Sequence, residues 1–256
     1  MISNNLRKLF PNWINVGCFL VAISAFLLLI YQFRDFGRRT WDKTNCVDNL
    51  KKVGVAMSQY TQDYDDVLPP RQNNSGIDGA AVSWRSILHS YVKSDVAYRC
   101  PINPLGADAD SDVGNDLELD GFSRSYAVNS TSDGRYCFGP FADRYWGKLR
   151  LNKIKRPELV VGVVETTAAF NDFNILFPQG FARESSVNRR VGYLFSGHKG
   201  SANYLYMDGH VKPMRPLDML DSTVKFNPWT IEGAPFSSSD QEKAKRVLEF
   251  SEKQSH

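Results

Sequence analysis

The sequence has few of the residues, and none of the short motifs, that usually identify an enzyme active site. It contains four histidines in 256 residues, and it has no Gly-x-Ser-x-Gly elbow, phosphate-binding loop or dinucleotide-binding fingerprint. Its four cysteines include no Cys-x-x-Cys pair, which excludes a zinc knuckle. We therefore expect a protein that is not an enzyme.

A large excess of charge of one sign is also missing. The formal net charge is +3, and no basic stripe with interleaved aromatic side chains accompanies it, so we expect no nucleic-acid partner. Hydrophobic residues make up 42% of the chain, enough for the packed core of one domain. The mean hydropathy of −0.36 is nevertheless that of a soluble protein, so any strong apolar excess must be local.

Charged residues are absent from Ile14 to Phe33, a run of 20 residues near the start of the chain. As a helix rising about 1.5 Å per residue, this run is about as long as the ~30 Å hydrocarbon core of a bilayer is thick. A cleaved signal peptide fits less well, because the apolar run is long and no Ala-x-Ala site follows it. The run predicts a transmembrane helix over 14–33, preceded by a short segment, 1–13.

Proline is absent between Pro11 and Pro69, so nothing in this interval forces a helix to break. The pattern predicts one helix from about Asn12 to Asp65, ended by Leu68 and the two prolines after it. Its part over 34–66 is expected to be amphipathic and to pack on a domain, because apolar side chains recur every three or four residues. These side chains are Val47, Leu50, Val53, Met57, Tyr60 and Tyr64.

The rest of the chain is predicted to be an α+β domain over 67–216 with a C-terminal extension, 217–256. A short helix is expected over Ser83–Val92, and the segment from Asp240 to Gln254 is expected to be a solvated or frayed terminal helix. Short strands are expected over 125–128, 159–165, 192–195, 202–207 and 210–214, with turn-forming residues between them.

One candidate metal site comprises His198, Asp208 and His210. Asp208 and His210 are two residues apart, so they share one face of a strand, and His198 could meet them across a hairpin. The alternative is that His198 and Asp208 cap turns, which the Asp208-Gly209 pair favours by itself.

An acidic segment is a second candidate, for calcium, because it is dense in the oxygen ligands that calcium prefers. Its spacing is not that of an EF-hand, and a solvated acidic loop is the alternative. Its carboxylates are Asp108, Asp110, Asp112 and Asp116. No other cofactor is expected.

The cysteines leave two arrangements open. Cys18 lies in the apolar run, whereas Cys46, Cys100 and Cys137 lie in the domain. One disulfide with a free thiol and three buried thiols both agree with this distribution.

Two stretches together resemble a known family. The first runs from Cys46 through Gly54 to Leu68-Pro69, and the second has nine residues between its histidine and its Asp-Gly pair. Together they resemble bacterial prepilin-type proteins with the His-x9-Asp-Gly motif, which are relatives of type II secretion pseudopilins. The family motif here comprises His198, Asn203, Asp208, Gly209 and His210.

The resemblance implies a pilin-like α+β fold, in which a long N-terminal transmembrane helix packs on a small antiparallel sheet. It implies a noncatalytic structural protein of a type II secretion or type IV pilus-like assembly, with the lipid bilayer and other pilin-like or secretion-system subunits as partners. It also implies anchorage in the inner membrane with the domain outside the cytoplasm, and a disulfide between Cys46 and Cys100.

The chain departs from the family in the apolar run, where Gly17 is followed by Cys18 and no glutamate occurs. This departure favours an uncleaved relative. One alternative is a membrane-anchored extracytoplasmic binding module, for example for calcium, that does not polymerise. A further alternative is a metal-dependent enzyme that uses His198, Asp208 and His210.

Overall fold

A computed structural model describes most of the chain. The described residues are 6–73, 82–103, 122–133, 136, 138–142, 149–167, 172–176, 193–220 and 226–253. The chain divides into two compact units, residues 1–44 and residues 45–256, and each is described here by itself.

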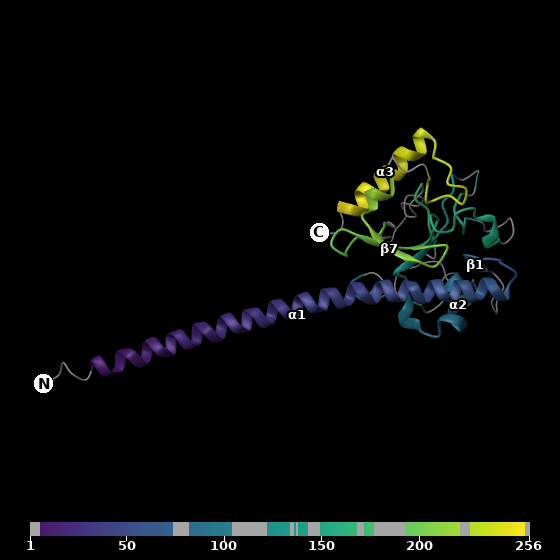
Figure 1. Cartoon of the computed structure of the whole chain (residues 1–256). Helices are drawn as coiled ribbons and strands as arrows, with labels where there is room; N and C mark the ends of the chain where they lie inside the picture. The colour runs from purple at the N-terminus through teal and green to yellow at the C-terminus, as the bar shows by residue number, and fades with distance from the viewer. Residues whose placement is uncertain are drawn as a thin grey trace, which may run out of the picture. The chain divides into compact units, whose positions relative to one another are not determined.

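The first helix, α1, is a single helix of 58 residues, Leu6–Asp63 (Figure 1). It begins earlier than the predicted start at Asn12 and ends close to the predicted end at Asp65. The chain leaves the helix where Asp65 and Asp66 take left-handed backbone angles, with φ of 53° and 65°. The prediction of one uninterrupted helix is confirmed.

The prediction that this helix spans a membrane over 14–33 is wrong. Among the described residues, no helix is both long enough and apolar enough to cross a bilayer. The predicted fold with a transmembrane helix, and the single-pass inner-membrane location, are wrong with it.

The second unit is built around a five-stranded sheet with the order β5-β3-β4-β6-β7. It is mixed, not antiparallel as expected, because β5 pairs in parallel with β3, while the other neighbours are antiparallel. The predicted strand over 192–195 is reduced, in its described residues, to a single bridge between Leu194 and Thr166. The strands are β3 (Tyr126–Asn129), β4 (Val161–Glu165), β5 (Asp172–Phe173), β6 (Ala202–Tyr206) and β7 (Val211–Met214).

The described part of this unit also contains smaller elements. Helix α2, Trp84–Val92, confirms the predicted short helix, and the side chain of Ser83 caps it by accepting from two backbone N–H groups. Beside it lies a two-stranded ribbon, β1 (Gln72–Asn73) with β2 (Val82–Ser83). The described residues also include the 3₁₀ helices η2 (Asp95–Tyr98), η4 (Leu151–Lys153) and η5 (Pro216–Leu220).

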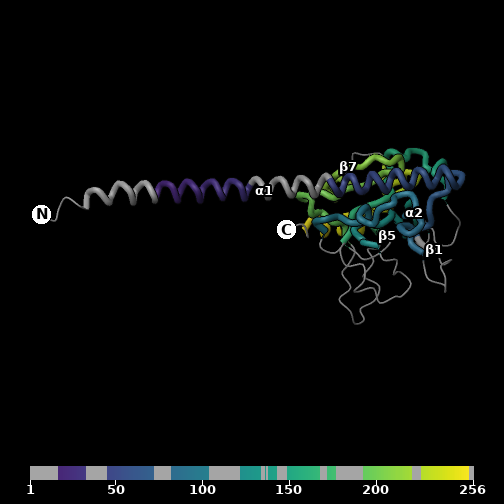
Figure 2. Tube along the Cα trace, turned by 90° about the horizontal axis from the view of Figure 1, so that it is seen from below, coloured from purple at the N-terminus to yellow at the C-terminus, as the bar shows by residue number. Residues whose placement is uncertain are grey.

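One face of the sheet packs against α1 and α2, which lie next to each other (Figure 2). Four of the six residues of the predicted apolar stripe are buried here and contact residues of β3, β4 and β6 in one continuous core, whereas Val47 is half-buried and Tyr64 is exposed. The phenol of Tyr91 on α2 donates to Asp63 at the end of α1, with 2.9 Å between the oxygens. The buried residues of the stripe are Leu50, Val53, Met57 and Tyr60, and Cys46 is buried beside them.

The other face of the sheet packs against the C-terminal helix α3, Ser238–Lys253. Its Ala244, Val247, Leu248 and Ser251 are buried. The predicted terminal helix is therefore confirmed, but the expectation that it is solvated or frayed is wrong. These four positions repeat at helical spacing, and that pattern places one face of α3 in the core.

Candidate functional site

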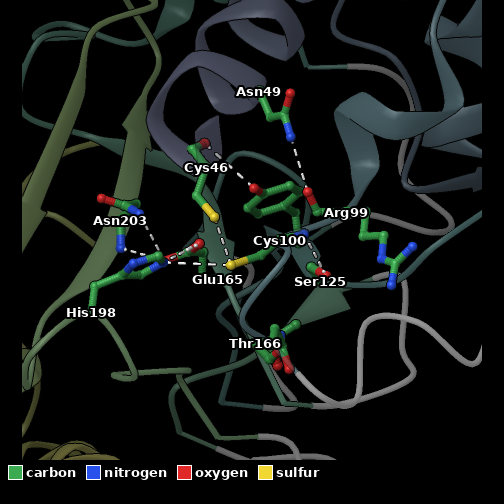
Figure 3. A network of polar contacts seen from close by, with 11 residues as sticks. Cys46, Asn49, Arg99, Cys100, Ser125, Glu165, Thr166, His198 and Asn203 are labelled. Carbon is green, nitrogen blue, oxygen red and sulfur yellow. Dashed lines mark hydrogen bonds and ion pairs between the residues drawn. The ribbon is translucent and has the colours of Figure 1, made fainter. Parts of the chain in front are cut away.

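Four polar side chains that are far apart in the sequence meet in the core (Figure 3). They come from α1 (Cys46), the turn after η2 (Cys100), the end of β4 (Glu165) and the turn before β6 (His198). One ligand atom from each lies within 4.8 Å of the others, and all four residues are buried. We call this group the Cys–Glu–His cluster, and its four side chains could hold a metal ion.

Within the cluster the two sulfur atoms are the closest pair. The Sγ atoms of Cys46 and Cys100 are 2.7 Å apart. Nε2 of His198 lies 3.5 Å from the Cys100 sulfur and 3.0 Å from Oε1 of Glu165. The imidazole of His198 therefore lies between the carboxylate of Glu165 and the sulfur of Cys100.

Hydrogen bonds to neighbouring groups position both cysteines. Asn49 lies one helical turn after Cys46, and its Nδ2 donates to the carbonyls of Val96 (3.2 Å) and Arg99 (2.9 Å). The backbone N–H of Cys100 donates to Oγ of Ser125 at 2.9 Å. The turn that carries Cys100 is therefore held against α1 by contacts that do not involve sulfur.

Glu165 is a fully buried carboxylate with partners on both oxygens. Its Oε2 accepts from the backbone N–H of Asn203 at 2.8 Å and from the Asn203 side-chain amide at 3.0 Å. Its Oε1 faces His198. These contacts offset the cost of burying a charge, which is severe when a carboxylate lacks partners.

The charges in the cluster follow from these contacts. Burial by itself lowers the pKa of His198, but hydrogen bonds with Cys100 and Glu165 outweigh it and raise the pKa to about 10. These contacts therefore favour the protonated form of His198. Burial raises the pKa of the Cys100 thiol, and the contact with Cys46 acts in the same direction, whereas the hydrogen bond with His198 lowers it.

The predicted metal set of His198, Asp208 and His210 is not assembled. His198 precedes β6 and Asp208 follows it, so a five-residue strand separates them. Asp208 and His210 instead pair with each other at the exposed turn of the β6–β7 hairpin, with 2.6 Å between Oδ1 and Nδ1. Asp208 also accepts the backbone N–H of His210 at 3.1 Å, as expected for a turn-capping residue.

Other predicted site residues have different outcomes. The acidic calcium segment with Asp108, Asp110, Asp112 and Asp116 lies outside the described residues, as does Cys137. Within the family motif, Asn203 supports Glu165, and Gly209 takes a left-handed turn conformation with φ of 92°.

Glu165 is the member of the cluster that sequence reasoning did not single out. It ends the apolar run from Val160 to Val164, and a carboxylate at the end of a buried strand is the signal that could have identified it. Its partners come from β6 and from the turn before it, so only the strand pairing brings them together.

The donor set limits the kind of ion that could be held. Two sulfurs, an imidazole and a carboxylate suit zinc or another transition metal, whereas calcium takes oxygen ligands. Neither a family model, nor a curated protein, nor a solved structure matches this chain. Its function must therefore be inferred from its own residues.

Proposed function

We propose that this protein is a noncatalytic, pilin-like structural subunit that assembles with other copies through the apolar N-terminal part of α1. The single observation that carries this proposal is the exposure of that part of the helix. Its large apolar side chains are between 39% and 71% exposed. They are Phe19, Leu20, Val21, Ile23, Phe26, Leu27, Leu28, Leu29, Ile30 and Tyr31.

Apolar exposure on this scale indicates an interaction surface. Phe26 to Tyr31 are six consecutive apolar residues, and an α-helix turns once in 3.6 residues, so they surround the helix completely. One partner packed along one side would leave the opposite side in water. Several equivalent helices packed around each other would cover all sides, which favours other copies of the chain as the occupant.

The rest of the molecule supports a structural role. The Cys–Glu–His cluster is the densest group of reactive side chains described, and its four residues are 0–3% exposed. A substrate in solution cannot reach such groups without opening the core. The buried stripe of α1 packs against the sheet, as expected for a rigid subunit. This arrangement agrees with the resemblance to prepilin-type proteins.

We propose no calcium site among the described residues. The sulfur donors of the Cys–Glu–His cluster do not suit it. A calcium site in the acidic segment, 108–116, remains a sequence-based prediction, to be tested by calcium titration of the full chain.

A matched pair of substitutions on α1 tests the proposal. Val21 and Val55 are the same residue type on the same helix, 67% and 58% exposed. We expect the full-length protein to sediment as assemblies in analytical ultracentrifugation and Val21→Glu to shift it towards monomer, with assembly weakened at least ~10-fold by loss of a buried valine. Val55→Glu should assemble like the unchanged protein.

A second measurement uses the exposed Cys18, which precedes Val21 by about one turn. Packing between copies should let mild oxidant link chains through Cys18, and Cys18→Ser should remove the linked dimer. The proposal is overturned if the full chain is monomeric at all concentrations, if Val21→Glu assembles as well as Val55→Glu, or if the chain binds lipid vesicles only as a monomer.

A further inference from the structure

We propose that Cys46 and Cys100 form a disulfide that cross-links α1 to the turn after η2. The Cys–Glu–His cluster then contains a covalent cross-link and is not a metal centre. This proposal is independent of the assembly proposed above. It concerns the interior of the second unit, whereas assembly concerns the apolar helix of the first.

The first support is the distance between the sulfurs. At 2.7 Å, the two Sγ atoms are closer to the 2.03–2.05 Å of a disulfide than to the spacing of two thiolates on zinc. Two sulfurs each about 2.3 Å from one tetrahedral zinc would be about 3.8 Å apart. Zinc would therefore need the sulfurs to separate by about 1 Å, whereas a disulfide needs a smaller approach.

The second support is the way in which His198 is held. A histidine that binds metal through one ring nitrogen almost always donates its other N–H to a carboxylate, a carbonyl or water. Here Nε2 is the atom that faces both Glu165 and Cys100, and Nδ1 is buried without a hydrogen-bond partner in the described structure. The ring is thus placed to pair with Glu165 and lacks the support of a metal ligand.

The third support is that the backbone around both cysteines is already in place. Asn49 ties the turn at Val96 and Arg99 to α1, and Ser125 holds the backbone N–H of Cys100. Both cysteines are free thiols in this structure, so contacts other than a bond between the sulfurs hold them next to each other. Because both cysteines are 0% exposed, the bond must form before the core closes or during its opening.

The bond requires an external oxidant, for which we name a thiol–disulfide exchange partner such as glutathione disulfide. One S–H bond on each cysteine breaks and one Sγ–Sγ bond forms. Two electrons and two protons pass to the partner disulfide, which is reduced to two thiols. The products are the linked chain and two partner thiols, so atoms and electrons balance.

The cross-link joins residues 54 apart in the sequence. Closing a loop of this length in the unfolded chain should lower the equilibrium constant of unfolding about 1,000-fold. The bond should also keep the turn that carries Cys100 on α1 when the sheet opens transiently.

The test uses full-length Cys18→Ser, in which copies cannot be linked through Cys18, and compares two conditions. Reduced, denatured protein is refolded either with glutathione disulfide and glutathione or with zinc chloride and no oxidant. After refolding with oxidant, we expect one titratable thiol per denatured chain, rising to three after reduction, and a single linked peptide pair containing Cys46 and Cys100. Zinc should be lost on dialysis and should not protect the thiols from later oxidation.

Stability gives a second readout. Reductant should raise the unfolding constant of the oxidised protein about 1,000-fold, should leave Cys46→Ala/Cys100→Ala unaffected, and should act on Cys18→Ser as on the unchanged chain. Three thiols in Cys18→Ser after oxidative refolding would overturn the proposal, as would a linkage through Cys137. So would one tightly held zinc per chain that blocks oxidation.

Discussion

Gly54 on α1 lies directly against Gly209 in the turn of the β6–β7 hairpin. A Cβ atom at position 54 would stand 3.2 Å from the carbonyl oxygen of Gly209 and 2.9 Å from a methyl group of Leu205. The helix can therefore approach the hairpin this closely only because residue 54 has no side chain. This contact joins the two stretches on which the family resemblance rests.

Gly54→Ala should destabilise the second unit despite the better helix propensity of alanine. Propensity favours alanine by about 1 kcal/mol, but forcing a methyl group against a backbone carbonyl in a packed core costs about 1–3 kcal/mol. We expect a net loss of about 1 kcal/mol, measured by urea unfolding with the fluorescence of the buried Trp84 and Trp229.

Gly17→Ala is the matched control, because a Cβ at position 17 meets nothing within 4 Å. It should leave the free energy of unfolding of the second unit unchanged. If Gly54→Ala proved as stable as Gly17→Ala, the close approach of helix and hairpin would not exist in solution.

Glu165→Gln should destabilise the protein by about 3 kcal/mol. The substitution removes the negative partner of a buried histidine and turns one acceptor into a donor that faces other donors on Asn203 or His198. Glu158→Gln is the control, since Glu158 forms an exposed ion pair with Arg156, and it should have no measurable effect. Equal stability of the two variants would contradict a buried ionic role for Glu165.

Asp172→Asn should weaken the edge of the sheet where β5 joins β3. Asp172 is nearly buried, accepts from Oγ of Ser130 at 2.5 Å, and pairs with Arg71. We expect a loss of about 2 kcal/mol in urea unfolding, because a buried charge-assisted contact is lost.

Asp48→Asn breaks the exposed pair with Lys51 and serves as the comparison. Exposed pairs contribute at most about 1 kcal/mol, so this variant should lose less than half as much as Asp172→Asn. The opposite order would show that the Arg71–Asp172 pair is not formed.

Local patterns were sufficient to predict the long helix. The stripe from Leu50 to Tyr60 repeats every three or four residues, and that repeat places one side of α1 in the core whatever the rest of the chain does. Strands β3, β4, β6 and β7 also lie near their predicted positions, because the short runs between turn-forming residues that predicted them are local patterns too. The two-residue strands β1, β2 and β5 are too short to carry a period.

The Cys–Glu–His cluster could not be predicted because it depends on pairing over long distances in the sequence. His198 was expected to meet Asp208, its neighbour in the motif. The register of β6 with β7, with Leu205 opposite Val211, instead puts Asp208 at the turn and leaves His198 at the far end of the strand. The partner of His198 comes from β4, and nothing in the local sequence specifies which strand lies beside β6.

Protonation of Asp240 in acid should lower the free energy of unfolding, because its carboxylate makes contacts at the N-terminus of α3. Its carboxylate accepts from Lys243 and from Oγ of Ser237, both at 2.8 Å, while Oγ of Ser237 accepts the Asp240 backbone N–H at 3.2 Å. The hydrogen bond from Lys243, followed by that from Ser237, lowers the pKa of Asp240 below its ordinary value of 3.8.

Because this pKa is lower in the folded protein, the unfolded chain binds the proton more readily as the pH falls. The contribution of Asp240 is therefore fully present above about pH 5 and is lost as the pH falls through the folded pKa. Unfolding of the unchanged protein and of Asp240→Asn, followed from pH 6 downward, should give a stability difference that shrinks below about pH 4. A difference that stays constant over this range would show that the carboxylate does not form these contacts in the folded protein.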